Sequence, residues 1–335
     1  MWPLWVSVLA LALAAGLLVS AGTKLVRTAD ELADRTGMGE AVAGALLLGA
    51  VTSLPGIVAT ATGALSGDAA FALANPVGGV AIQTVWLAIA DLLYRRANLE
   101  HAAASLENLL QSLILVALLA VPVIAYATPQ LVWGWIHPLT LMIPVLYGYG
   151  FVLLRQMHKA PMWKPTMTAE TREDEPEPGS DRSDRRLWGT LAALGVVVGA
   201  VGWVIGQAGL GLVAATGLPS GIVGFTITTA ITSLPELVTL IAAVRIGALT
   251  LGVGGVIGGN VFDTLLITVA DVAYLEGSIY RSAGPSSLVL LGGTVLITAI
   301  LTSGLVVRDR KGIGFEGLAI PGAYAATVVL AILAR

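Results

Sequence analysis

The sequence predicts an all-α membrane protein with ten transmembrane helices, arranged as two inverted repeats of five helices. Three observations predict this fold class. The 335 residues are 56% hydrophobic and only 12% charged, with a mean hydropathy of +0.86, and water cannot solvate such a chain as a globule. Ten apolar segments are long enough to cross a bilayer. One sequence pattern within these segments occurs twice.

The same composition argues against several classes of protein. The chain contains no cysteine, which excludes a disulfide scaffold and a thiol enzyme. A net charge of −3 with scattered basic residues makes nucleic acid an unexpected partner. The three histidines lack metal-ligand spacing, and no phosphate-binding loop motif is present. We therefore expect no enzyme, no catalytic residue and no cofactor; the expected partners are membrane lipid and inorganic cations, and oligomeric state stays open.

Each predicted span contains about 20 mostly apolar residues. The first segment resembles a signal peptide in hydropathy, but no basic residue precedes Lys24, so we interpret it as a transmembrane helix. The ten predicted spans are 3–22, 40–66, 69–93, 105–126, 131–155, 187–208, 218–245, 249–274, 284–304 and 316–334.

The basic residues predict the orientation of the chain in a cell membrane. With the amino terminus outside, every Lys and Arg except Arg281 and Arg335 falls in or beside an inner loop. Both termini are therefore expected outside. The segment 156–186 is rich in proline and charge and lacks apolar periodicity, so it is predicted to be a cytoplasmic linker. It divides the chain into a first half, 1–155, and a second half, 187–335.

An offset of 180 residues aligns the sequence with itself. Thr-Ser-Leu-Pro at 52–55 meets Thr-Ser-Leu-Pro at 232–235, and the match continues without a gap to the paired glycines at 78–79 and 258–259. The first copy covers about 40–94 and the second about 220–274. Five spans separate equivalent positions, so the copies enter the membrane from opposite sides. Inverted repeats of this kind are typical of secondary transporters, whose ion sites lie where the halves meet.

Both Thr-Ser-Leu-Pro motifs lie in the middle of an apolar span. Proline removes a backbone donor and frees a carbonyl of the preceding turn, so each helix should kink or unwind there. The freed carbonyls and the hydroxyls of Thr52, Ser53, Thr232 and Ser233 are hard oxygen ligands suited to Na⁺ or Ca²⁺. The glycine-rich stretch 252–259 is expected to interrupt a second span.

Two carboxylates, Glu236 and Asp263, fall in the central part of their spans. A buried carboxylate is costly unless a cation or proton joins it, which makes both residues candidates for a cation site. Their counterparts in the first copy are Gly56 and Gln83, so the second copy supplies both charges. The site would carry −2, which one Ca²⁺, two Na⁺ or two protons neutralise. Asp91 and Asp271, near span ends, are interpreted as architectural.

These motifs resemble the two alpha-repeats of the sodium/calcium exchanger, or cation:Ca²⁺ antiporter, superfamily. The resemblance is carried by both Thr-Ser-Leu-Pro elements, the glycine pairs that follow them, and the run Gly-Gly-Asn-Val-Phe-Asp at 258–263. It implies a cation site on the predicted second, third, seventh and eighth helices. The positions of this chain that match the implied ligand pattern are Thr52, Ser53, Thr232, Ser233, Glu236, Asn260 and Asp263, and Gln83 is the candidate eighth ligand.

The chain departs from the family pattern mainly in the first copy. Gly56 stands in place of a glutamate, Gly79 and Gly259 in place of serines, and Val80 and Gln83 in place of asparagines. The predicted function is secondary-active antiport of a metal cation, Ca²⁺ or Na⁺, against Na⁺ or H⁺ by alternating access. The alternative is a transport-inactive membrane scaffold or cation sensor derived from the family. The sequence does not choose among the cations, the stoichiometry or the physiological direction.

Overall fold

The structure is a computed structural model that describes residues 2–36, 49–93, 105–129, 131–159, 183–246, 249–307 and 314–334. Among these residues the fold is helical, with one isolated bridge between Trp133 and Ile136. Eight described helices are long and apolar enough to cross a membrane, and a bent helix pair, Ser220–Thr232 with Leu234–Arg245, raises this number to nine. The predicted span 40–66 and the linker 156–186 lie partly outside the described residues.

The described part of the first half contains seven α-helices and two short irregular helical segments before the linker. The predicted fifth span starts late, because Gly134 has a positive φ of 67° and Pro138 opens the following turn. The elements are α1 Leu4–Leu17, η1 Leu18–Gly22, α2 Thr23–Thr36, α4 Gly49–Thr52, α5 Leu54–Leu65, α6 Ala69–Leu93, α8 Leu106–Ala127, η3 Pro138–Leu141 and α9 Met142–Lys159.

The second half begins with a helix that is longer than the predicted span 187–208. This helix is terminated by Gly217, which adopts the left-handed conformation. The elements are α10 Asp184–Thr216, α11 Ser220–Val223, η4 Gly224–Thr228, α12 Thr229–Thr232, α13 Leu234–Ile246, α14 Leu249–Asp263, α15 Leu265–Ala273, α16 Ile279–Ser282, α17 Gly284–Val307 and α18 Phe315–Leu333.

The helices break where the proline motifs predict. Ser53 separates α4 from α5, and Ser233 separates α12 from α13, each two residues before a proline. The second copy bends by 49° at this break. The expected interruption at 252–259 is wrong: α14 continues through these glycines, and the break lies at Thr264. The Thr264 hydroxyl donates to the Val261 carbonyl at 2.7 Å, so a side chain competes locally with the helical ladder.

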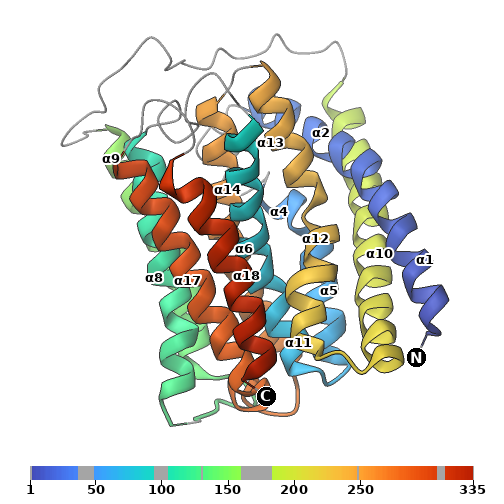
Figure 1. The fold of residues 1–335 in the computed structure, drawn as a ribbon. Coiled ribbons are helices and arrows are strands. Elements are labelled where there is room, and N and C mark those ends of the chain that lie inside the picture. The colour runs from blue at the N-terminus through green and yellow to red at the C-terminus, as the bar shows by residue number, and fades with distance from the viewer. Residues whose placement is uncertain are drawn as a thin grey trace.

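Helix bounds recur at the same offset of 180 residues. The segments α4 and α5 correspond to α12 and α13, and α6 corresponds to α14 and α15 taken together. In Figure 1 the chain runs downward through α4 and α5 but upward through α12 and α13, and the N and C labels lie at the same, lower end of the molecule. The two copies therefore run in opposite directions in space.

Two repeat-equivalent contacts connect the halves. A side chain at Gly202, on α10, would lie 2.5 Å from the Pro55 carbonyl oxygen, and one at Gly22 would lie 2.8 Å from Cγ of Pro235. Glycine is required at both positions because the broken helix of the other copy approaches so closely. The first helix of each half thus packs on the proline motif of the opposite half.

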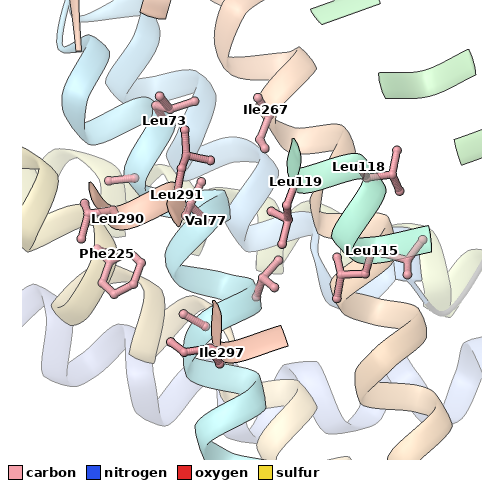
Figure 2. Packing of buried hydrophobic residues seen from close by; sticks show 14 of the residues in the cluster. Leu73, Val77, Leu115, Leu118, Leu119, Phe225, Ile267, Leu290, Leu291 and Ile297 are labelled. Carbon is pink, nitrogen blue, oxygen red and sulfur yellow. The ribbon is translucent and has the colours of Figure 1, made fainter. Parts of the chain in front are cut away.

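The core surrounds α6, which is the most buried of the candidate spans. Small residues along this helix let α5, η4, α14, α17 and α18 pack against it. Figure 2 shows Leu73 and Val77 of α6 gathered with Phe225, Leu290 and Leu291. Dispersion and close packing hold such helices together, since lipid is as apolar as leucine. The breaks at Ser53 and Ser233 lie beside this core helix.

Candidate functional site

The candidate site lies where the two helix breaks meet α6 and the end of α14. Glu236 occupies the first turn of α13, three residues after the break at Ser233, and Asp263 is the last residue of α14. Only 6% of Glu236 and 4% of Asp263 is exposed. The proline motif thus places one carboxylate at the start of a helix, and the Thr264 break places the other at the end of one.

Asp263 is held by residues of the first copy. The Ser53 hydroxyl donates to Oδ1 of Asp263 at 2.5 Å, and the Gln83 amide nitrogen donates to Oδ2 at 2.9 Å. Hydrogen bonds to a carboxylate are stronger than those between neutral groups. Gln83 and Asp263 are repeat-equivalent, so the two copies meet at this pair.

A second, symmetry-related contact completes this arrangement. The Gln83 amide nitrogen also lies 3.3 Å from the Ser233 hydroxyl oxygen, and the pair Gln83 and Ser233 is the repeat equivalent of Asp263 and Ser53. In one copy a serine donates to a carboxylate, and in the other a serine accepts from an amide. The hydrogen-bond framework is repeated while the charge is not.

Glu236 is less completely satisfied than Asp263. The Thr52 hydroxyl forms a hydrogen bond to it, and Asp263 lies close enough to repel it electrostatically. Its Oε2 atom is buried and has no hydrogen-bond partner among the described residues. A buried oxygen of this type favours a cation or a proton as its missing partner. The repulsion between the two carboxylates favours the same partner.

A cavity of about 10 Å³ lies between these side chains, close to the space that one water-sized species needs. No lysine or arginine is among the residues that line this cavity. The lining residues are Ser53, Gly56, Asn75, Pro76, Gly79, Thr232, Ser233, Glu236, Asp263 and Leu266.

The eight predicted site residues fall into three groups. Five line the cavity: Ser53, Thr232, Ser233, Glu236 and Asp263. Thr52 and Gln83 contact the two carboxylates without lining the cavity. Asn260 lies behind the site, where its amide nitrogen donates to the Thr84 hydroxyl at 3.1 Å and its Oδ1 has no partner among the described residues.

Sequence reasoning missed Asn75, which is buried and lines the cavity. Its amide nitrogen donates to the Thr60 hydroxyl at 2.9 Å and to the Gly56 carbonyl at 3.3 Å. Its Oδ1 accepts from Thr228 and Thr229 at 3.3 and 3.4 Å. A polar residue directly before a mid-span proline was the available signal. Asn75 fixes the first turn of α5 against η4 and α12.

Asp271 has the architectural role that the sequence predicts. Its carboxylate accepts the backbone N–H groups of His137 and Ile279, at 2.9 and 3.3 Å. These donors come from two different loops, so Asp271 ties both loops to the end of α15. It lies outside the candidate cavity.

Chemically, the site offers two carboxylates together with hydroxyl and amide oxygens. No group of three or more His, Cys, Asp or Glu side chains suited to a metal occurs among the residues that the structure describes. Neutral oxygens must therefore complete any coordination shell. Such an oxygen-only ligand set suits Na⁺ or Ca²⁺ and not a soft transition metal.

The fold is similar to those of solved structures that include two exchangers. A structure of an H⁺/Ca²⁺ exchanger, CAX, aligns with a TM-score of 0.65 at 15% identity, covering 99% of this chain and 86% of that chain. The sodium-calcium exchanger NCX_Mj, soaked with 10 mM Na⁺ and 10 mM Sr²⁺, aligns at 0.62 and 16% identity, covering 97% and 98%. Native YfkE aligns at 0.61 and 14%, covering 99% and 93%. Identities this low establish a shared fold and nothing about cargo.

The apolar helices of membrane-spanning length define a multi-pass helical membrane protein. The sequence profile described as sodium/calcium exchanger protein matches residues 6–155 and 186–333, on both sides of the linker. The chain belongs to this family. It is therefore a transporter-family protein and not a member of an enzyme family, as predicted. A comparison with curated protein sequences finds no significant match.

Proposed function

We propose that this protein is a secondary-active antiporter that exchanges a metal cation, Ca²⁺ or Na⁺, against Na⁺ or H⁺ by alternating access. The observation that carries the proposal is the juxtaposition of Glu236 and Asp263, buried side by side with no basic residue in the cavity lining. Two carboxylates in this environment are stable only when a cation or proton is bound. Cations and protons must then compete for one site, and such competition is the basis of antiport.

The proposal includes ten spans, an inverted repeat and the domain division 1–155, 156–186 and 187–335. The opposite directions of the two copies support it, as do the reciprocal contacts of Gly22 with Pro235 and of Gly202 with Pro55. In inverted-repeat transporters the two halves exchange conformations around a fixed central site. Here the site consists of Thr52, Ser53, Gln83, Thr232, Ser233, Glu236 and Asp263, with Asn260 behind it.

Reconstitution tests this function directly. Purified protein in liposomes is expected to take up radioactive Ca²⁺ or Na⁺ only when an opposing Na⁺ or pH gradient is imposed. Uptake that needs no countergradient would indicate a channel or uniporter. Absence of uptake under every gradient, with cation binding intact, would favour the alternative of a membrane scaffold or cation sensor.

The proposed orientation has its own test, because the chain contains no native cysteine. A cysteine at Ser180, in the linker, is expected to react with impermeant reagents only from the cytoplasm. A cysteine at Ser66, which is exposed between α5 and α6, is expected to react only from outside. The reverse pattern would overturn the proposed orientation.

A further inference from the structure

Beyond the cavity, polar side chains continue along α14 where it packs against α6 and α8. We define the polar face as Gln83 of α6, Asn108 and Gln111 of α8, and Asn260 of α14. Three glycines of α14 let amide oxygens approach the helix. Cβ atoms at Gly254, Gly258 and Gly259 would lie 2.9, 3.7 and 3.5 Å from the amide oxygens of Asn108, Gln111 and Gln83. The glycines thus keep the side of α14 beside these oxygens free of side chains.

Three oxygens of the polar face lack donors. The side-chain oxygens of Gln83, Gln111 and Asn260 are buried and have no hydrogen-bond partner among the described residues. Gln83 is 1% exposed and Asn260 is fully buried. Buried acceptors without donors cost free energy, and bound water or a cation is their usual partner. A single such atom is unremarkable, but three along the contacts of α14 with α6 and α8 point to water or cations beside this helix.

Gln83 corresponds to Asp263, but two other residues of the polar face have apolar repeat equivalents. Leu291 corresponds to Gln111 and Val80 to Asn260, and both apolar residues are buried. Figure 2 shows Leu291 packed with Val77 and Leu290 beside Phe225. The backbone of η4 packs directly against Gly78, the repeat equivalent of Gly258. A Cβ at Gly78 would lie 2.5 Å from the Phe225 carbonyl oxygen. The inverted copies thus differ in polarity at equivalent positions.

From these contacts we infer that the polar face is a water-accessible route for small hydrated cations, which connects the site with the side of the membrane on which α8 begins. That end lies opposite the two chain termini (Figure 1) and is cytoplasmic in the orientation proposed above. The acceptor oxygens point to cations and water, since anions need donors. This inference deepens the proposed antiport by assigning one of its two access routes.

Cysteine accessibility tests the route without relying on transport. Gln111→Cys is compared with Leu291→Cys, its repeat equivalent, and with Leu113→Cys, a 52% exposed position on the lipid side of α8. Each is treated in liposomes with impermeant cationic and anionic methanethiosulfonate reagents of similar size. Apolar surroundings suppress the reactive thiolate, so we expect Gln111→Cys to react about tenfold faster than either control.

The reaction should also be faster with the cationic reagent and occur only from the side where α8 begins. If Gln111→Cys and Leu291→Cys react equally slowly, the route is overturned. Close Cα–H···O contacts with the glycines would then explain why the amide oxygens lack hydrogen-bond donors. Equal reaction with both reagents would overturn the preference for cations. If Gln111→Cys does not fold, Gly258→Cys takes its place, because its Cβ has ordinary contact distances.

A transport measurement then connects the route with the site. Gln111→Leu, which copies the repeat-equivalent residue, should slow exchange several-fold while the equilibrium affinity for Na⁺ or Ca²⁺ stays unchanged. An equal loss of affinity would place Gln111 in the binding site itself and overturn the route. Labelling without any exchange would contradict the proposed function and leave the water route standing.

Discussion

The segments 49–93 and 229–273 begin their helices at a constant offset and share the break at the proline motif, yet they bring different chemistry to the cavity. The second copy contributes both carboxylates, Glu236 and Asp263. At the equivalent positions the first copy contributes Gly56, which exposes backbone, and Gln83, which donates an amide hydrogen to Asp263. The difference teaches that the repeat preserves the backbone break and the hydrogen-bond framework, while the charge of the site depends on only two positions.

The largest expected effect comes from removing the charge of the second copy. Glu236→Gln and Asp263→Asn should each reduce exchange about 100-fold or more, because breaking a buried ionic interaction costs about 3–5 kcal/mol. Isotope flux in liposomes measures the loss. Asp91→Asn, at a residue interpreted as architectural, is the control and should retain substantial flux. A Glu236→Gln variant with wild-type flux would contradict the site assignment.

Restoring the charge of the first copy should change selectivity. Gly56→Glu changes the charge of the deprotonated site from −2 to −3. It also adds a carboxylate that can bind a cation through both oxygens, which favours Ca²⁺ over Na⁺. A Cβ there would lie 3.3 Å from a flexible Leu266 methyl group, so the backbone tolerates it. We expect the concentration of Na⁺ that halves Ca²⁺ binding to rise about tenfold, equivalent to about 1.4 kcal/mol.

The matched control for this gain is Gly56→Gln, which has the same size without the charge. Competition binding on the same preparations should separate the two variants. If both behave like the wild type, Gly56 does not act on the bound cation, and the contrast between the two copies loses its functional meaning.

Asn75 tests whether the first copy also contributes positioning. Asn75→Ala removes the amide that holds the Gly56 carbonyl and Thr60, and leaves Thr228 and Thr229 without one acceptor. The loss of neutral hydrogen bonds, about 1 kcal/mol each, predicts a several-fold fall in flux. Asn75→Gln and Asn75→Asp are compared with it. Wild-type flux in all three would show that the cavity needs no support from α6.

The smallest effects should separate the two reciprocal packing contacts. Gly202→Ala places a methyl group against the Pro55 backbone and should destabilise the protein by about 1–3 kcal/mol. Gly22→Ala meets only the ring of Pro235 and should cost less. Thermal denaturation in detergent, followed by the fluorescence of the native tryptophans, measures both. Equal stability losses would mean that the two contacts are energetically equivalent despite their different atoms.

The sequence alone determined the membrane class, and it predicted the repeat and most of the candidate site. Apolar length predicts spans because lipid cannot satisfy backbone groups outside helices, and the span 69–93 coincides with α6. Proline disrupts the helical turn that precedes it, so the positions of Pro55 and Pro235 in the sequence predict the breaks at Ser53 and Ser233. Buried carboxylates stand out in an apolar run whatever the packing. For these reasons the sequence alone singles out Glu236 and Asp263 as candidate site residues.

Tertiary structure decided what depends on neighbours. Glycine can bend a helix or admit a close contact, and only the tertiary structure distinguishes the two. Here α14 stays helical through 252–259, and amide oxygens of α6 and α8 lie close to three of its glycines. Asn75 is part of the cavity lining, where Thr228 of η4 and Thr229 of α12 donate hydrogen bonds to its Oδ1. Asn260 lies behind the candidate site, where its amide nitrogen donates a hydrogen bond to the Thr84 hydroxyl. Local sequence specifies where a helix can break, whereas the partners of a buried polar group come from segments far away in the chain.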